Sequence, residues 1–357
     1  MENKPVFFGC PLDVDERDES IEEKRASMAP DGQDDGWDDP YVRIMEVLGQ
    51  EISSELYEAR GSLPVPGWLR PIPPPTEREK VTLEQFVQFI DGNGCLEYAD
   101  QVGVFVGQEI LPQIPCLLAV DHSLSGGVFK KLAETYGPDN LSWIVLDSHT
   151  DALPVSVMTG AVRYDLETNP DSLHDPNDPY LVNRPDSYNA SSFLDHLLSE
   201  GIVLPHNLYV LGIGDYPPKQ AFRIKDPRIE KFVGYFLKLK KQGVTLLTKN
   251  DLLISPSKVK SVLKQIRTPW VYISIDLDIG ARNALEGVRF LDRQGLNGPQ
   301  LLRVIGYLRD VLKRGIGLAG FDLCEINPRT AGRQLPTGQD QTYCIAVDII
   351  KKLAWSL

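Results

Sequence analysis

The sequence predicts an α/β protein, a three-layer α/β/α sandwich built on a doubly wound, mostly parallel sheet. The first observation behind this prediction is the order of segments. From about residue 80 onward, short apolar runs alternate with longer segments in which apolar residues have helical spacing. The second is chain size, because 357 residues with 42% hydrophobic residues can bury a large core. Since parallel strands need crossover helices, this order indicates helices on both faces of one sheet.

The region before residue 80 has a different character. An apolar run at residues 6–10 predicts a first strand that can join the sheet. Acidic residues dominate residues 13–40, which favours a solvated or partly ordered surface segment over an acidic binding arm. Residues 41–59 have helical spacing of apolar positions, and the proline-rich residues 63–78 predict an extended connector.

The chain is therefore divided into an acidic and proline-rich N-terminal segment, residues 1–79, and a main domain, residues 80–357. Six strands are predicted in the main domain, at residues 115–123, 141–149, 206–214, 244–249, 270–278 and 316–326. The helices between or after them are predicted at residues 126–137, 191–201, 227–243, 255–266, 299–315 and 339–357. A long irregular loop, residues 152–190, follows the second of these strands.

Charge and cysteine usage limit the possible partners and location. A net charge of −13 and a pI near 4.9 argue against nucleic acid as a partner and favour cationic ligands. The five cysteines are scattered and form no C-x-x-C pair, which is typical of reduced thiols in a cytoplasmic protein. The sequence shows neither a signal-peptide pattern nor a run of about 20 apolar residues, so we predict no membrane partner. Oligomeric state is left open, a homo-oligomer included.

Polar residues follow three of the predicted strands at the edge where an α/β sheet binds ligands. Alternation along an extended chain places the three groups in the stretch DSHTD, residues 147–151, on one side. Imidazole and carboxylate are ligands of Mn, Ni, Zn or Fe, and so many acids at one point suit two cations. The predicted metal ligands are His122, Asp147, His149, Asp151, Asp276 and Asp278.

Four short motifs carry a family resemblance. VDHS at 120–123, DSHTD at 147–151, SIDLD at 274–278 and CEINP at 324–328 resemble, in order and spacing, the signatures of the ureohydrolase family of arginases, agmatinases and formimidoylglutamases. The resemblance covers roughly residues 115–357. It implies an arginase-like catalytic domain with two Mn²⁺ ions, although ligand type alone also admits other divalent transition metals.

The resemblance assigns roles residue by residue. It implies that one ion is held by His122, Asp147, Asp151 and Asp276. It implies that the other is held by Asp147, His149, Asp276 and Asp278, with Asp147 and Asp276 bridging. Glu325 matches the glutamate that binds the guanidinium group of the substrate. The two ions would lower the pKa of a water that attacks the guanidino carbon, and Asp151 would accept a hydrogen bond from that nucleophile.

Four positions bear on catalysis and substrate choice. Asn189 stands where the family has a histidine thought to assist proton transfer. His174, in the intervening loop, is the candidate to replace it, although a surface loop histidine is the more usual interpretation. Leu153 stands where arginases have an asparagine that contacts the α-carboxylate, which makes free arginine a poor substrate. Asp215 matches an acidic position that senses the α-amino group in arginases, although a loop aspartate is more often a turn residue.

The favoured function is hydrolysis of an arginine side chain within a peptide, giving ornithine and urea. An agmatinase-like hydrolase of a small guanidino compound is the alternative. A non-catalytic metal-binding relative and a different metal-dependent amide hydrolase are two further hypotheses. The last of these would be preferred if Glu325→Gln left activity intact, because a guanidinium-binding carboxylate would then be irrelevant.

Overall fold

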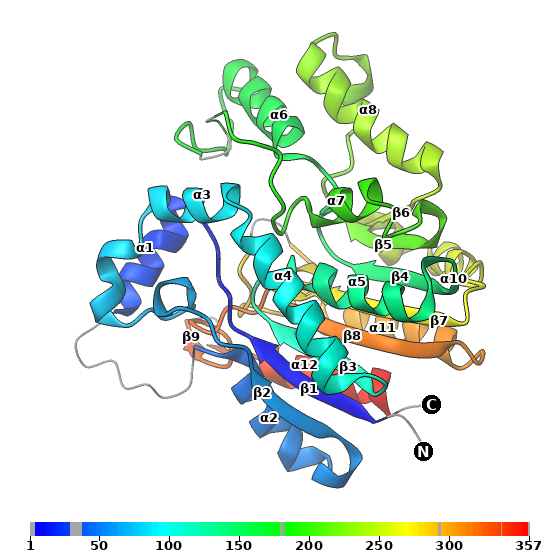
Figure 1. Cartoon of the computed structure of the whole chain (residues 1–357). Helices are drawn as coiled ribbons and strands as arrows, with labels where there is room; N and C mark the ends of the chain where they lie inside the picture. Colours follow the sequence, from blue (N-terminus) through cyan, green and yellow to red (C-terminus); the bar gives the residue numbers. More distant parts are fainter. Residues whose placement is uncertain are drawn as a thin grey trace.

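The computed structural model describes residues 4–28, 38–178, 181, 183–291, 294–336 and 338–355. Its centre is an eight-stranded sheet in which every neighbouring pair is parallel, so the predicted fold class is confirmed (Figure 1). In spatial order the strands are β2 (Glu58–Ser62), β1 (Pro5–Cys10), β3 (Ile114–Ala119), β8 (Gly317–Cys324), β7 (Trp270–Asp276), β4 (Leu141–Leu146), β5 (Leu208–Ile213) and β6 (Thr245–Thr248).

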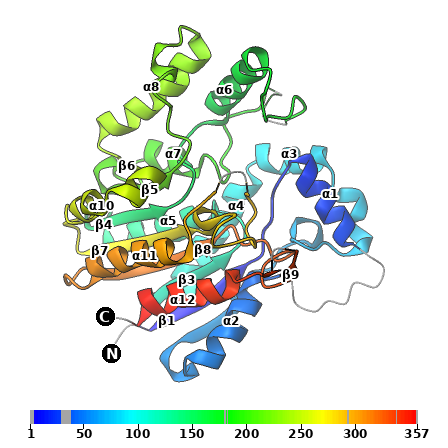
Figure 2. The same ribbon diagram turned by 180° about the vertical axis from the view of Figure 1, so that it is seen from behind.

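Helices cover both faces of this sheet, which explains why its central strands are continuous apolar runs. Successive strand residues point to opposite faces: Phe8 packs in one core and Phe7 in the other. The Phe8 side is covered by α4 (Gly94–Phe105), α5 (Leu124–Tyr136), α7 (Phe193–Ser199) and α8 (Pro227–Gln242). The Phe7 side is covered by α2 (Pro40–Glu51), α9 (Lys249–Ile254), α10 (Pro256–Leu263), α11 (Gly298–Leu312) and α12 (Thr342–Ala354) (Figure 2).

The strand order creates the place for a site. The chain passes from β3 to β4, which are not neighbours, and β8 and β7 later fill the space between them. Ligand sites of α/β proteins lie outside the carboxyl ends of strands at such a crossing point. The carboxyl ends of β3, β8, β7 and β4 therefore converge on one region.

The N-terminal segment differs from its prediction. Residues 13–16 are buried rather than solvated, and residues 18–27 form a helix, α1 (Asp18–Ser27). The prediction was wrong because buried cations pair with these acids: Lys24 Nζ lies 3.1 Å from Asp13 Oδ2, and Arg184 Nη1 lies 2.7 Å from Glu16 Oε1. Residues 29–37 of the same predicted surface segment lie outside the described residues.

Two neighbouring stretches also differ. The predicted helix at 41–59 ends at Glu51, and Glu58–Ser62 instead forms edge strand β2 beside β1. The proline-rich stretch is partly core rather than a plain connector, because Leu63, Val65 and Leu69 are buried in the main hydrophobic cluster. Short 3₁₀ turns at Gly67–Leu69 and Pro75–Lys80 interrupt its extended backbone.

The long loop predicted at 152–190 contains a helix, α6 (Val155–Thr168). This helix packs beside α8, and the pair projects from the body of the molecule (Figure 1). Another helix that the sequence pattern did not reveal, α3 (Leu83–Asp91), precedes α4. Over the described ranges, no helix is long and apolar enough to cross a membrane.

Candidate metal centre

Four neighbouring strands deliver the polar residues of the candidate site. Asp147 directly follows β4, Asp276 is the last residue of β7, and Glu325 directly follows β8. His122 comes three residues after the end of β3. Because parallel strands end at the same edge, motifs separated by up to two hundred residues meet here, as the sequence predicted.

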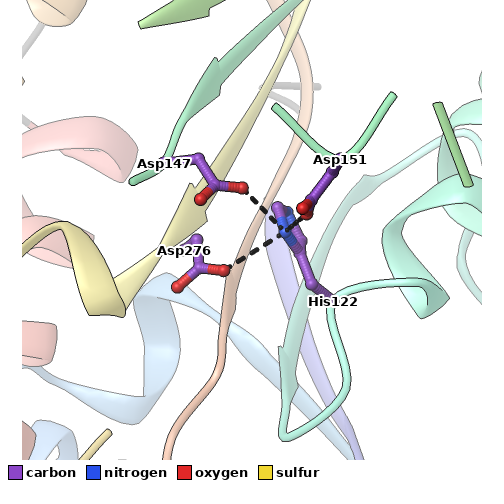
Figure 3. A group of neighbouring side chains, drawn as sticks. All are labelled: His122, Asp147, Asp151 and Asp276. Carbon is purple, nitrogen blue, oxygen red and sulfur yellow. Dashed lines mark hydrogen bonds and ion pairs between the residues drawn. The ribbon is translucent and has the colours of Figure 1, made fainter. Parts of the chain in front are cut away.

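The first group surrounds His122 (Figure 3). The ring nitrogen Nδ1 of His122 lies 2.9 Å from Asp151 Oδ2, 3.3 Å from Asp147 Oδ2 and 3.4 Å from Asp276 Oδ2. All four side chains are buried, and their ligand atoms lie within 4.8 Å of one another. Asp151 has a left-handed backbone with φ 48°, which turns its carboxylate back toward this group.

The second group shares Asp147 with the first. Nδ1 of His149 lies 2.8 Å from Asp278 Oδ2 and 3.7 Å from Asp147 Oδ1. The ligand atoms of Asp147, His149 and Asp278 again lie within 4.8 Å of one another. Asp276, which the resemblance assigns to both groups, belongs in this structure to the first alone.

The electrostatics of these groups fit bound cations. Burial raises the pKa of Asp151 and of Asp276 well above the ordinary value, and the neighbouring carboxylates raise it further by repulsion. Asp147 Oδ2 and Asp278 Oδ2 are buried, and each lies near an imidazole nitrogen, that of His122 or His149. A divalent cation in each group would supply the missing positive charge, and two imidazoles with four carboxylates are suitable ligands.

A hydrogen-bond chain behind His122 orients its ring. Nε2 of His122 lies 2.9 Å from Ser274 Oγ, and that hydroxyl donates to Asp322 Oδ1 at 2.8 Å. Because the single hydroxyl proton is used toward Asp322, Ser274 Oγ accepts from the Nε2–H of His122. Nδ1 then keeps its lone pair for a cation. Ser274 stands two residues before Asp276 on the same strand, a spacing that could have revealed it from the sequence.

Asp215 lies beside the DSHTD loop and hydrogen-bonds to it. Its two oxygens accept from the backbone N–H of Thr150 at 3.0 Å and from the Thr150 hydroxyl at 2.6 Å. Burial raises its pKa, although the hydrogen bonds from Thr150 oppose that effect. The structure therefore gives Asp215 a positioning contact with the metal-ligand loop, and a role in sensing an amino group stays a prediction.

Three other predicted residues lie apart from the ligand groups. The side-chain oxygen of Asn189 accepts from the backbone N–H and hydroxyl of Ser191, at 3.0 and 2.8 Å. Leu153 is buried in the hydrophobic core. His174 has a side chain 47% exposed and lies 3.9 Å from Asp165 at the end of α6. A catalytic role for His174 stays a prediction, and its position in the structure does not support that role.

Glu325 contacts a residue that the sequence reasoning missed. Its Oε1 accepts from the backbone N–H of His122 at 3.2 Å and from Nη1 of Arg289 at 3.2 Å. Burial raises the pKa of Glu325 to about 8, although Arg289 lowers it. Arg289 lies in the loop between Asp278 and α11, outside the four motifs of the family resemblance, so no motif pointed to it.

The open side of the site is marked by His149, whose side chain is 30% exposed while the other five predicted ligands are buried. The Phe290 ring lies edge-on to the His149 ring with centroids 5.8 Å apart. The guanidinium of Arg17 lies 3.9 Å from the centroid of the Phe290 ring. An aromatic and a cationic side chain therefore lie next to the partly exposed ligand His149.

Carboxylate and imidazole groups that share one aspartate, at the strand ends of a doubly wound sheet, define a hydrolase class with a candidate binuclear metal site. The Arginase family model matches residues 95–355, and the chain belongs to the arginase family. It is accordingly a metal-dependent hydrolase of guanidino or amidino C–N bonds. No curated protein matches this chain.

Solved structures show the same fold at low identity. The chain is similar to formimidoylglutamase from Bacillus subtilis, at 17% identity and a TM-score of 0.57 over 98% of this chain and 86% of that one. It is similar to an arginase from Bacillus subtilis, at 18% identity and 0.57 over 99% and 98%. It is similar to an agmatine ureohydrolase of Thermoplasma volcanium, at 14% identity and 0.50 over 99% and 89%.

Proposed function

We propose that this protein is a binuclear manganese hydrolase that converts an arginine side chain within a peptide to ornithine and releases urea. The observation that carries the hydrolase part is the pair of carboxylate–imidazole groups sharing Asp147. Membership of the arginase family supports a guanidino or amidino C–N bond as the target. The identity of the metal as manganese and of the substrate as a peptide are the more specific parts of the proposal.

The chain's own residues would divide the work as follows. His122, Asp147, Asp151 and Asp276 would hold one cation, and Asp147, His149 and Asp278 the other. Two divalent cations held there would lower the pKa of a water and so supply a nucleophile near neutral pH. Asp151 would accept a hydrogen bond from that nucleophile. The buried Oε2 of Glu325, which accepts no hydrogen bond among the described residues, would bind the substrate cation.

Three residues support a substrate that lacks the free α-carboxylate and α-amino groups of an amino acid. Leu153 is apolar and buried, so it cannot bind an α-carboxylate. The side-chain oxygens of Asp215 and Asn189 are already used by Thr150 and Ser191. An arginine inside a peptide carries neither free α-group, and a net charge of −13 favours a basic chain.

Agmatine also lacks the α-carboxylate, and it is the alternative substrate. The side chain of His149 is partly exposed, and this exposure does not distinguish a small molecule from a longer chain. A chain that binds metal but releases no urea would instead be a non-catalytic relative.

The test loads the purified protein with Mn²⁺ and offers free arginine, agmatine and an arginine-containing peptide in parallel. Urea is measured in each reaction and each product is weighed by mass spectrometry. We expect urea and loss of the guanidine carbon with the peptide, and little with free arginine. Urea release from agmatine alone would show that the substrate is a small guanidine and not a peptide. No urea from any of the three substrates, with metal bound, would contradict the hydrolase proposal.

A further inference from the structure

Arg289 is a buried guanidinium inside the candidate site. Its side chain is 2% exposed, and Nη1 donates to Glu325 Oε1 at 3.2 Å. Nη1 also lies 3.6 Å from Asp121 Oδ2, and Nη2 donates to the backbone oxygen of Val14 at 3.1 Å. The protein thus places its own guanidinium against the carboxylate that the family resemblance assigns to the substrate guanidinium.

Asp13 anchors Arg289 from the N-terminal segment. Asp13 Oδ1 lies 3.2 Å from Nε of Arg289, and Asp13 Oδ2 lies 3.1 Å from Lys24 and 3.0 Å from Arg329. Removing Arg289 from this place would leave the buried carboxylate of Glu325 without the cation that contacts it, which is costly in a dry environment. Arg289 is therefore a fixed part of the site and not a side chain that a substrate easily displaces.

The anchoring of Arg289 limits what Glu325 offers. Oε1 of Glu325 is taken by Arg289 and by the backbone N–H of His122, whereas Oε2 is buried and accepts no hydrogen bond from any described residue. A guanidinium binds a carboxylate best through two parallel N–H···O bonds. With Oε1 occupied, a substrate guanidinium cannot form this fork of two parallel hydrogen bonds with Glu325.

We propose that Arg289 is a positioning and specificity residue that holds Glu325 by Oε1, so that a substrate guanidinium is bound through Oε2 alone. This inference rests on the proposed function and deepens it. A guanidinium bound through one oxygen, beside a fixed positive charge, contributes little affinity by itself. The remaining affinity comes from contacts with the rest of the substrate at the open side of the site, which favours a peptide over a small guanidine.

The test measures binding rather than turnover, so it remains informative if no urea is released. Methylguanidine and methylamine are titrated into the Mn²⁺-loaded wild type and Arg289→Met by calorimetry. Both probes are monocations, but only methylguanidine can form the fork. We expect Arg289→Met to raise methylguanidine affinity by about tenfold more than methylamine affinity, the scale of one added charge-assisted hydrogen bond.

Two controls keep the result interpretable. Metal content and a thermal unfolding curve show whether Arg289→Met is folded and loaded, and Arg289→Gln replaces it if it is not, because the amide can still donate to Asp13. Glu325→Gln in the Arg289 variant should abolish the gain. Equal changes for both probes, or no gain for methylguanidine in a folded and loaded variant, would overturn the proposal. Absence of urea with the expected binding result would overturn only the proposed function.

Discussion

His122 is held from behind by Ser274, whose Oγ lies 2.9 Å from the ring nitrogen Nε2. This contact directs Nδ1 toward three aspartates and links a metal-ligand candidate to Asp322 in the adjacent strand. Ser274→Ala should lower Mn²⁺ affinity by about 10- to 100-fold, because ring orientation is lost while the ligands remain. Competition with a chelator measures this change.

The matched control is Ser142→Ala. Ser142 is also fully buried, but it accepts a hydrogen bond from Thr268 at the opposite end of the sheet. Its removal should leave metal affinity unchanged. Equal loss in both variants would show that Ser274 acts through stability and not through His122.

Asp147 is the residue shared by the two ligand groups. Asp147→Ala should therefore remove metal from both, whereas Asp278→Ala should spare the group around His122. Elemental analysis after dialysis gives the metal content per chain. Retention of metal and full activity in Asp147→Ala would contradict the two-cation arrangement.

Glu325→Gln should reduce kcat/KM for the guanidino substrate by about 10-fold, the lower end of the about 1.5 to 3 kcal/mol that a hydrogen bond to a charged group contributes, because only Oε2 binds the guanidinium. Steady-state urea release measures the loss. Metal content serves as the control, since Glu325 is outside both ligand groups. Unchanged activity would favour a different amide substrate.

The metal-free protein should lose stability as pH rises. The pKa of Glu325 is about 8 in the folded protein against an ordinary value of 4.5, so the folded state binds more protons than the unfolded state between these values. Stability then falls across that window. The raised pKa values of Asp151 and Asp276 act in the same direction. Urea unfolding at several pH values with a chelator measures the slope, and added Mn²⁺ should reduce it because cations favour the ionised carboxylates.

Lys24 is fully buried against Asp13. Lys24→Met should destabilise the fold by about 3 kcal/mol, near the lower end for breaking a buried ion pair, because Arg289 and Arg329 still neutralise Asp13. Denaturant unfolding measures this loss. Lys4→Met, at an exposed position, is the control and should have little effect.

The sequence predicted the sheet and the ligand groups because both depend on local patterns. Apolar runs mark strands buried on both faces, and each ligand stands at or just beyond a strand end, so topology alone brings His122 near Asp147 and Asp276. Ser274 was within reach of the same reasoning, since it alternates with Asp276 on one strand.

Long-range charge pairing was beyond that reasoning. Asp13 and Glu16 have the composition of a solvated segment, and only the folded chain shows that Lys24, Arg184 and Arg289 neutralise them. The contact between Arg289 and Glu325 joins the loop before α11 to the CEINP motif, and no spacing rule connects the two. The local hydrogen bonds of Asn189 and Asp215 also depend on the folded loops, and the roles assigned to these two residues stay predictions.

The most direct measurement is electron paramagnetic resonance of the protein during titration with Mn²⁺. The arrangement of two ligand groups sharing Asp147 predicts the spectrum of an exchange-coupled manganese pair as the second ion binds, and its loss in Asp147→Ala. A spectrum of isolated Mn²⁺ at saturation, or no binding at all, would contradict the binuclear site on which the proposed hydrolysis depends.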